Sequence, residues 1–353
     1  MSEPICDIVI PIWNQPELTA ACLQSVAACT EIPARLILVD NGSEAPTCEL
    51  LNRFKAEGKL PAEILRNPTN LGFIKAVNQG IRAGKAPWVC LLNNDTVVTT
   101  GWLSEMIRVA ESDPGIGLVN PTSNCLGYPA KGRPPGEITR RLAENRGKSA
   151  PLSTAIGFCL LARRSLFDQI GLLDEQFGMG NFDDDDFSLR VRQAGLRPVR
   201  AAAAYVHHEE KASFKKLPGW EKAFDENRKK FEQKWGRRLR ILWGPVVPAS
   251  LSIDALAGAG HWISVIGPLN GKSGKKSDHA QVDYLPSTPG GWRSKALWRL
   301  VTKRKKPFDL VVSLDPAWSR WIRRLQLLHR AKLLENPTQN ELLEQCRTLS
   351  RSQ

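Results

Sequence analysis

Apolar segments rich in β-branched residues alternate with segments of helical periodicity over the first 120 residues of the chain. Strands are predicted at Asp7–Ile12, Arg35–Asp40, Ala62–Arg66, Trp88–Asn93 and Ile116–Val119. Helices are predicted at Glu17–Ala28, Thr47–Glu57, Phe73–Ala83 and Trp102–Ser112, the first with Asn14 as its cap ahead of Pro16. Because such alternation is typical of βαβ units, we expect an α/β fold with a mostly parallel sheet flanked by helices.

The pattern changes after residue 120. Residues 121–153 are rich in Pro, Gly and Arg and have little periodicity, which predicts a long surface connection. Regular elements are predicted again in the segments that follow, as a strand at Thr154–Ala162, a helix at Asp184–Ala194, a strand at Ala203–His207 and a basic helix at Trp220–Trp235.

A second unit is predicted to begin near Arg240. The segments ILWGPVVP, HWISVIG and FDLVVSLDP resemble short buried strands, and SLSIDALAGAG is helix-like. We therefore expect two parts, a large α/β domain over residues 1–240 and a small basic α/β appendage over residues 241–353, in which a short βαβ unit is predicted.

Composition limits the class of protein. With 42% apolar residues the chain can build real cores, which excludes general disorder. It contains no run of roughly 20 apolar residues, and its first residues lack the basic region of a signal peptide, so we expect a cytoplasmic protein. The eight cysteines form no C-x-x-C pair and are expected to be reduced and buried.

The net charge of +13 is unevenly distributed. Residues 1–210 hold 21 basic and 24 acidic side chains, whereas residues 211–353 hold 28 basic and 12 acidic ones, a balance of +16. The excess indicates either a solvated face or an anionic partner, which could be lipid headgroups, a pyrophosphate-linked acceptor or nucleic acid.

Polar residues follow the predicted strands, where open α/β sheets bind ligands. Asn14 follows the first strand, Asp40 ends the second, and Asn93-Asn94-Asp95 follows the fourth. No G-x-G-x-x-G follows the first strand, which disfavours an ordinary dinucleotide fold. Asp40 could accept hydrogen bonds from a base or ribose, or could form only a turn at the strand end.

Four adjacent carboxylates, Asp183 to Asp186, stand out further along the chain. Like charges this close raise one or more pKa values, which suits a general base. The alternative is a structural one, in which the aspartates cap the following helix and complement its dipole.

Six blocks together resemble the family 2 glycosyltransferases of the GT-A fold. They are VIPIWNQPELTAACLQSV, LILVDNGS, NPTNLGFIKAVNQGI, LLNNDTVV, GFCLLARRSLFDQIGLLDEQF and FDDDDFSLRVRQAG, followed by VHHEEKASF. The blocks keep the family's order and approximate spacing over residues 6 to about 214. The resemblance implies an inverting transfer of a sugar from a nucleotide diphosphate.

The resemblance also implies roles for individual residues. The nucleotide sugar would be bound by Pro11, Asn14, Asp40, Gly72, Lys75, Asn78, Asn93 and Asn94. Asn93-Asn94-Asp95 occupies the place of the family's D-x-D motif, where Mg²⁺ or Mn²⁺ bridges protein and pyrophosphate. Asn93 replaces the first aspartate, so Asp95 is the remaining carboxylate. The metal ligands would be Asp95 and one of two histidines, with His207 preferred and His208 the substitute.

The acidic run aligns with the family's E-D-x-D-L pattern. Asp183 takes the place of the Glu, Asp184 that of the first Asp and Asp186 that of the second. Asp184 is the expected general base, which would take the acceptor's proton as the hydroxyl attacks the anomeric carbon.

The expected function is therefore an inverting glycosyltransferase of polysaccharide biosynthesis in the cell envelope. Its partners would be a nucleotide-diphosphate sugar, a glycan or lipid-linked acceptor and, through the basic C-terminal part, the anionic inner face of the cell membrane; nucleic acid is not favoured. The alternatives are a sugar nucleotidyltransferase, for which the phosphate loop is missing, and a non-catalytic glycan or nucleic-acid binding protein.

Overall fold

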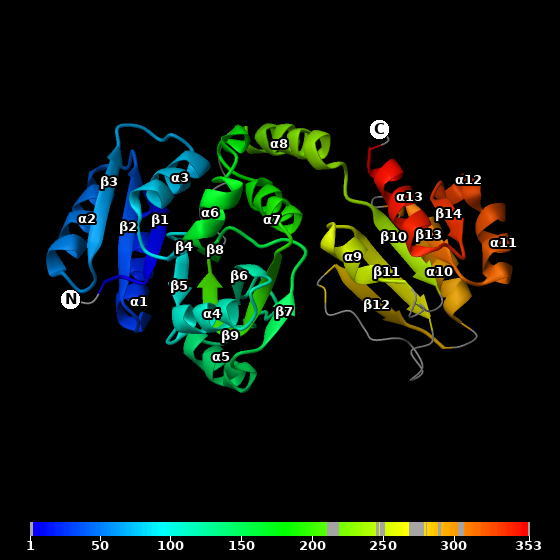
Figure 1. Ribbon diagram of the computed structural model, residues 1–353, viewed down its shortest axis with the longest axis horizontal. Coiled ribbons are helices and arrows are strands. Elements are labelled where there is room, and N and C mark those ends of the chain that lie inside the picture. Colours follow the sequence, from blue (N-terminus) through cyan, green and yellow to red (C-terminus); the bar gives the residue numbers. More distant parts are fainter. Residues whose placement is uncertain are drawn as a thin grey trace. The chain divides into compact units, whose positions relative to one another are not determined.

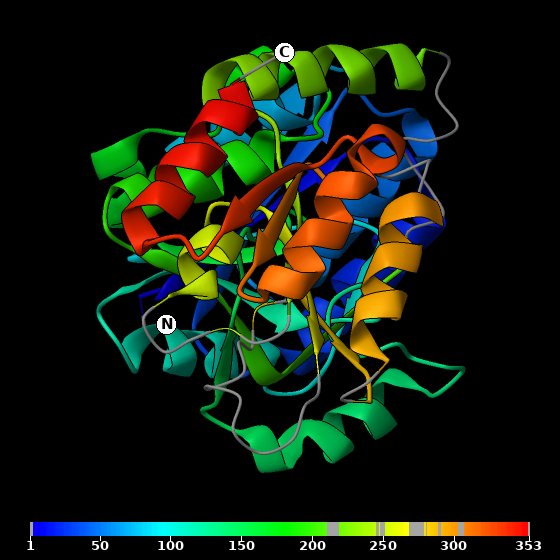
Figure 2. The same ribbon diagram turned by 90° about the vertical axis from the view of Figure 1, so that its right-hand side faces the viewer.

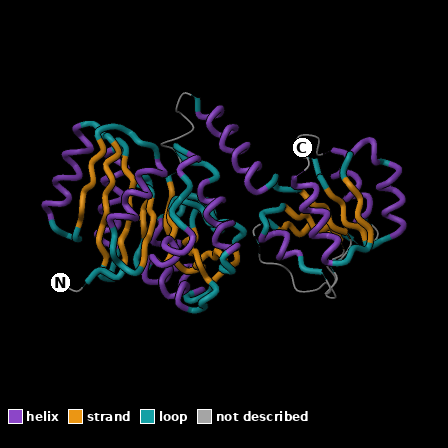
Figure 3. Tube along the Cα trace, turned by 45° about the horizontal axis from the view of Figure 1, so that its top comes forward, coloured by secondary structure: helices purple, strands orange, loops and turns teal. Residues whose placement is uncertain are grey.

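The structure, a computed structural model, describes residues 3–209, 219–244, 247, 251–267, 279, 281–288, 291–302 and 307–351. It divides into two compact units, Met1–Lys230 and Phe231–Gln353, and the division falls within a helix. In each unit the strands lie between helices (Figures 1 and 3). Part of the last motif, including the predicted loop after the histidines, lies outside the described residues.

The first unit is built on a nine-stranded sheet. Its strands are β1 (Cys6–Ile12), β2 (Ala34–Asn41), β3 (Ala62–Asn67), β4 (Trp88–Leu92), β5 (Thr96–Val98), β6 (Ile116–Thr122), β7 (Ser149–Pro151), β8 (Cys159–Arg163) and β9 (Arg197–His208). The order is β3-β2-β1-β4-β8-β6-β9-β5, with β7 added to β9. Strands β1 to β4 pair in parallel, and β8 runs antiparallel between β4 and β6. The predicted α/β class with a mostly parallel sheet is confirmed.

Helices cover both faces of this sheet. The helices of this unit are α1 (Pro16–Cys29), α2 (Ala45–Glu57), α3 (Phe73–Ala83), α4 (Trp102–Glu111), α5 (Pro135–Leu142), α6 (Arg164–Ile170) and α7 (Asp183–Gln193), with 3₁₀ turns at Ala143–Asn145 and Glu175–Phe177. Helix α8 (Trp220–Trp235) contains the division between the two units. Helices α1, α2 and α4 share one core with the β1 residues Ile8 and Ile10. On the opposite face α3 lies so close to β1 that a Cβ on Gly80 would meet Val9 Cγ1 at 2.3 Å.

Four sequence expectations need correction in this unit. Residues 121–153 are not a plain loop, because they contain α5 and β7, and Ile138 of α5 packs with Leu142 and Tyr205. The strand expected from residue 154 begins at Cys159, and the one expected from residue 203 begins at Arg197. Asn14 does not cap α1: Gln15 occupies the cap position without a side-chain bond, and Asn14 Oδ1 accepts from the Glu44 amide instead.

The second unit has its own parallel sheet. Its strands are β10 (Arg240–Gly244), β11 (Trp262–Gly267), β12 (Val282–Pro286), β13 (Leu310–Ser313) and β14 (Lys332–Glu335), in the order β12-β11-β10-β13-β14. The helices are α9 (Ile253–Gly258), α10 (Trp292–Thr302), α11 (Pro316–Arg324), α12 (Gln326–His329) and α13 (Gln339–Arg351). Consecutive residues of β10 pack into separate cores. Trp243 packs with residues of α9 and α13, and Leu242 packs with residues of α10 and α11. The unit is thus larger than a short βαβ appendage.

Two further expectations concern the whole chain. No helix in the described part of the chain is long and apolar enough to span a bilayer. All eight cysteines are free thiols, as predicted, but not all are buried, because Cys125 is exposed and Cys29 and Cys48 are partly exposed.

Candidate active site

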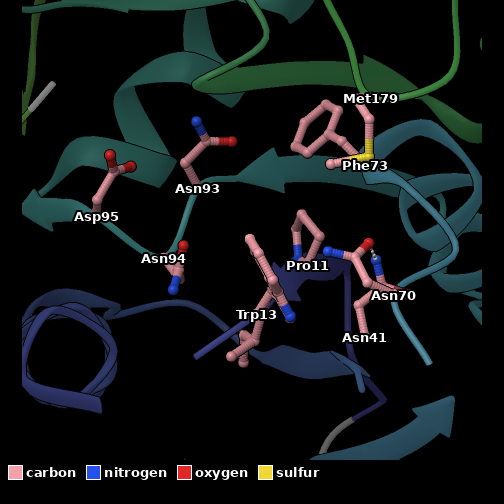
Figure 4. A pocket seen from close by; sticks show the side chains of 10 residues that line it. Pro11, Trp13, Asn41, Asn70, Phe73, Asn93, Asn94, Asp95 and Met179 are labelled. Carbon is pink, nitrogen blue, oxygen red and sulfur yellow. Dashed lines mark hydrogen bonds between the residues drawn. The ribbon is translucent and has the colours of Figure 1, made fainter. Parts of the chain in front are cut away.

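Two neighbouring hollows open at the carboxyl ends of the strands in the first unit. The first is lined by Pro11, Ile12, Trp13, Asn41, Asn70, Phe73, Asn93, Asn94, Asp95 and Met179. Figure 4 shows these side chains around it, with Asp95 and Asn94 on one side and the pair Asn41 and Asn70 on the other. Its polar lining is mostly amide groups, with one carboxylate.

The second hollow shares Phe73, Asn93 and Met179 with the first. Its other lining residues are Ile156, Gly157, Phe158, Gly180, Asn181, Phe182, Asp183, Asp184, Asp185, His208 and Phe224. It therefore brings the acidic run at the start of α7 to the end of β9. A molecule that occupied both hollows would pass beside Asn93.

Asp95 and His208 face each other at the junction of β4, β5 and β9. The Nε2 atom of His208 lies 3.2 Å from Oδ1 of Asp95, and both side chains are largely buried. Although burial lowers the pKa of His208, its interactions with Asp95 and Cys125 outweigh that effect and raise the pKa to about 9. Within the described residues, Oδ1 of Asp95 has no hydrogen bond of good geometry.

The ring and backbone of His208 are fixed by their neighbours. The ring of Phe158 stacks on it, with 5.1 Å between centroids and 12° between planes. Asn124 clamps the backbone of His208, accepting from its amide at 2.8 Å and donating to its carbonyl at 2.8 Å. The second ring nitrogen, Nδ1, lies 3.9 Å from the Cys125 sulfur. This arrangement aims Nε2 at Asp95.

His207, the preferred histidine of the sequence analysis, lies elsewhere. Adjacent strand residues point to opposite sides, so its side chain turns away from Asp95. Its Nε2 lies 3.4 Å from Glu209, and its Nδ1 lies 3.4 Å from the Tyr205 hydroxyl. The structure thus joins Asp95 to the substitute, His208.

An Asp–His pair of this kind fits a divalent cation. Because Oδ1 of Asp95 is buried without a well-directed hydrogen bond, it keeps an oxygen available for a hard cation. Within the described ranges, no group of three or more His, Cys, Asp or Glu side chains is arranged to hold a metal. Most ligands would therefore have to come from a bound molecule or from water.

The four aspartates of the acidic run have different surroundings. Asp184 is partly buried; its Oδ2 accepts from the Gly157 amide at 3.1 Å and its Oδ1 from the Asp185 amide at 2.8 Å. Burial, followed by the charges of Asp185 and Asp183, holds the pKa of Asp184 well above its usual value. Burial also raises the pKa of Asp183 to about 6.

Asp186 belongs to the scaffold. It is fully buried, and its Oδ2 accepts from Arg190 Nε at 2.9 Å. Arg190 also donates to the carbonyls of Ile170 and Leu172, so the pair ties α7 to the end of α6. Asp186 does not line the second hollow, whereas Asp183 and Asp184 do.

The residues expected around the nucleotide sugar divide into three groups. Pro11, Asn93 and Asn94 line the first hollow. Asp40 and Asn14 support its rim from behind: Asp40 is bound to Arg66 at 2.7 Å and to the Ser43 amide, and Asn14 is bound to the turn that follows β2.

The other three lie in or next to α3. Gly72 has φ 92°, a conformation that favours glycine, and its Cβ would meet the Gly178 carbonyl at 3.1 Å. Asn78 is buried and bonds to the backbone of Leu173 and to Glu175, so it connects α3 to a distant loop. Lys75 is exposed and lines neither hollow.

Several lining residues were missed in the sequence. Asn41 Nδ2 donates to Asn70 Oδ1 at 2.8 Å, and this pair forms one wall of the first hollow. Trp13 is 39% exposed and Met179 is 36% exposed, a large apolar area for a hollow lined with amides. Trp13 and Asn41 are each next to a residue that the motifs predict in the site, Asn14 and Asp40, and the motifs do not indicate which neighbour faces the hollow.

Comparisons with known proteins find a family model that matches part of the chain. The sequence model of Glycosyl transferase family 2 matches residues 7–171. Solved structures of related shape include a mannosyltransferase from Pyrobaculum calidifontis in complex with GDP-Man and Mn²⁺, at 17% identity and a TM-score of 0.48 over 59% of this chain and 57% of that one. S. aureus TarS 1-349 in complex with UDP-GlcNAc has 14% identity and a TM-score of 0.49 over 65% of this chain and 66% of that one.

Curated relatives are similar over the same region. An uncharacterized protein, y4gI, of Sinorhizobium fredii is 30% identical over 60% of this chain and 25% of its own length. The O-antigen biosynthesis protein RfbC of Myxococcus xanthus is 26% identical over 60% and 18%. An N-acetylglucosaminyl-diphospho-decaprenol L-rhamnosyltransferase of Mycobacterium tuberculosis is 28% identical over 53% and 70%. The chain thus spans a quarter or less of the length of the first two.

Proposed function

Residues 7–171 are a glycosyl transferase family 2 domain, and we propose from this premise that the chain transfers a sugar from a nucleotide-diphosphate donor to a hydroxyl of a glycan or lipid-linked acceptor, with inversion at the anomeric carbon. The observation that carries the proposal is the pair of joined hollows. A hollow rich in amides, which contains Asp95, meets a second one that contains His208 and a carboxylate of raised pKa, so that the Asp95–His208 pair lies between the two.

The first hollow suits the nucleotide of the donor. Pro11 and the exposed ring of Trp13 offer apolar surface to a flat base, and the amides of Asn41 and Asn70 can exchange hydrogen bonds with it or with the ribose. The diphosphate would then lie toward Asp95 and His208. A Mg²⁺ or Mn²⁺ ion held by these two side chains would offset the negative charge that develops on the departing diphosphate.

The second hollow suits the acceptor. As the acceptor oxygen bonds to the anomeric carbon, the bond from that carbon to the diphosphate oxygen breaks, and the hydroxyl proton passes to Asp184. The amides of Gly157 and Asp185 hold this carboxylate in place. Because a raised pKa makes the carboxylate a stronger base, Asp184 is better suited to accept a proton than an exposed aspartate would be. Attack from the face opposite the leaving group inverts the centre.

The acceptor we propose is a lipid-linked precursor of a cell-envelope polysaccharide. The names of the rhamnosyltransferase and O-antigen relatives support this class. We accordingly propose a cytoplasmic enzyme that works at the inner face of the membrane, where such an acceptor would be found.

The test measures transfer directly. The full chain is incubated with UDP-, GDP- and dTDP-sugars, Mn²⁺ and a short-chain polyprenyl-diphospho-sugar, and the release of nucleoside diphosphate is recorded beside the glycosylated product. We expect one donor to be used, with the product of opposite anomeric configuration by NMR. The matched control is Asp184→Asn.

Other outcomes decide against the proposal. Release of inorganic pyrophosphate from a sugar phosphate and a nucleoside triphosphate would favour a nucleotidyltransferase. Donor binding without turnover for every acceptor class would favour a binding protein. Retention of configuration would contradict a single direct displacement at the anomeric carbon with Asp184 as the base.

A further inference from the structure

One helical layer of the second unit exposes large apolar side chains. Trp298 of α10 is 67% exposed, Trp321 of α11 is 51% exposed, and Leu327 and Leu328 of α12 are 92% and 61% exposed. Helix α12 contacts both α10 and α11. Figures 1 and 2 show the three helices next to one another on one side of the five-stranded sheet. We call these four side chains the apolar patch.

The patch is not needed for the core of its own unit. On the inner side of the same helices, Trp292, Trp318 and Ile322 pack against the sheet and are almost completely buried. Trp318 and Ile322 are spaced four residues apart and share the inner face of α11, whereas Trp321 lies on its outer face. Large apolar side chains exposed on adjoining helices indicate an interaction site in a folded protein.

Positive charge surrounds the patch. Residues 316–332 contain five Lys and Arg and no Asp or Glu, and residues 292–302 contain three and none. Arg320, Arg324 and Arg330 are exposed, and the Arg324 guanidinium lies 5.5 Å from the ring centroid of Trp321. Nearby acidic groups are already engaged, Asp315 by Arg293 and Glu335 by Arg323. A partner for this face must accept both apolar groups and cations.

We propose that the apolar patch and its arginines form a docking surface for an anionic lipid bilayer. Leucine and tryptophan would enter the boundary between headgroups and acyl chains, and the arginines would pair with lipid phosphates. The exposed leucines favour a bilayer over a nucleic acid, since they have no polar group to offer to a phosphate backbone. This inference gives a physical basis to the membrane location in the proposed function, but it concerns a different unit of the chain.

The test is co-sedimentation of the full chain with vesicles. Phosphatidylcholine vesicles are compared with vesicles that also contain phosphatidylglycerol, at low and high salt. We expect binding to the anionic vesicles that weakens with salt. The double variant Leu327→Ser, Leu328→Ser removes the two exposed leucines of the apolar patch and should abolish most of the binding to anionic vesicles. Arg320→Gln with Arg324→Gln should weaken binding roughly 30-fold.

The matched control removes the same charge from the opposite helical layer. Arg347→Gln with Arg351→Gln on α13 lowers the net charge equally and should leave binding nearly unchanged. Equal losses in the two arginine variants would overturn the docking surface and leave only general charge attraction. Absent binding, or binding that both patch variants retain, would also overturn it.

Two further measurements separate the alternatives. If the leucine variant changes the molar mass in light scattering and not vesicle binding, the patch joins two copies of the chain and the bilayer proposal is wrong. Donor turnover with a water-soluble acceptor, measured without vesicles, should be the same in all variants. That assay measures only the proposed sugar transfer, so failure of the transferase proposal and failure of the bilayer proposal can be told apart.

Discussion

Replacement of His208 by alanine should weaken Mn²⁺-dependent binding of a nucleoside diphosphate far more than replacement of His207. His208 supplies the nitrogen that lies 3.2 Å from Asp95, and Phe158 and Asn124 hold it there. Loss of an outer-shell partner of a metal ligand typically costs 10-fold to 100-fold in affinity, so loss of the ligand itself should cost on the order of 100-fold or more.

His207→Ala is the matched control because it removes the adjacent imidazole. Its contact with Glu209 is partly exposed, and such pairs contribute about 0–1 kcal/mol to stability. Because the His207 side chain points away from Asp95, we expect metal-dependent binding to change little in this variant, by less than about fivefold, the factor that ~1 kcal/mol represents. Circular dichroism and the urea midpoint of both variants establish that each is folded.

The assay is calorimetric titration of the nucleoside diphosphate at fixed Mn²⁺, repeated with chelator. It has a pH signature, because the pKa of His208 is about 9 and a bound metal requires the neutral ring. Apparent affinity should thus rise as pH increases toward 9, by at most about tenfold per pH unit, and His208→Ala should remove most of that dependence. An equal loss in His207→Ala would refute the assignment. Indifference of the unmodified chain to metal and chelator would mean that basic side chains stabilise the leaving group.

Four other expectations follow from the same geometry. Asp184→Asn should keep donor binding in calorimetry while lowering single-turnover transfer by about 10²-fold to 10⁴-fold. Asp186→Asn should leave donor binding unchanged but lower the urea-derived free energy of unfolding by about 3 kcal/mol, because it leaves the Arg190 guanidinium without its negatively charged partner. Gly80→Ala should cost about 1–3 kcal/mol in the same measurement, since α3 has no room for a Cβ. In metal-free protein, the stability that His208 contributes through its raised pKa is complete below about pH 6.5 and should be lost as pH rises through 9, as a thermal melt series would detect.

Elements with a strong periodic pattern could be predicted from the sequence, and elements made by distant pairing could not. Helices α3 and α8 begin and end where periodicity predicted. Helix α5 begins at Pro135 and buries only Ile138 and Leu142, too few residues to form a visible pattern. Strand β7 is three residues long and exists because it pairs with β9. No local signal in residues 121–153 distinguishes these elements from a loop.

The choice between the two histidines illustrates the limit for the site. The motif placed both at the end of a strand, but which one faces Asp95 depends on register, since a shift of one residue exchanges the faces. In the structure His208 pairs with Thr96 and His207 with Val97. That register follows an irregularity earlier in β9, where its pairing with β6 jumps from Ala201 to Tyr205. Sequence spacing carries no information about such a jump.

Buried hydrogen bonds limited the other site predictions. Asn78 lies in a motif rich in polar residues, so a ligand-binding role was a reasonable expectation. Its amide instead bonds to Leu173 and Glu175, more than 90 residues away in the chain. Asp40 is similar, because its carboxylate is bound to Arg66 on the neighbouring strand. A motif can identify a polar residue near a site, but only the fold determines whether its hydrogen bonds are already used.

Asn93, which stands where the family's D-x-D motif has its first aspartate, also suggests how metal and donor would bind. Asn93 leaves Asp95 as the one carboxylate in the triplet, and within the described residues the structure brings the His208 imidazole to it. Two protein ligands are few for Mg²⁺ or Mn²⁺, which prefer about six oxygen-rich positions. The diphosphate of a donor could supply further oxygens, and water the rest. Metal and donor would then bind together, each raising the affinity for the other. The neutral amide of Asn93 would lie between the two hollows and would add no negative charge next to the diphosphate.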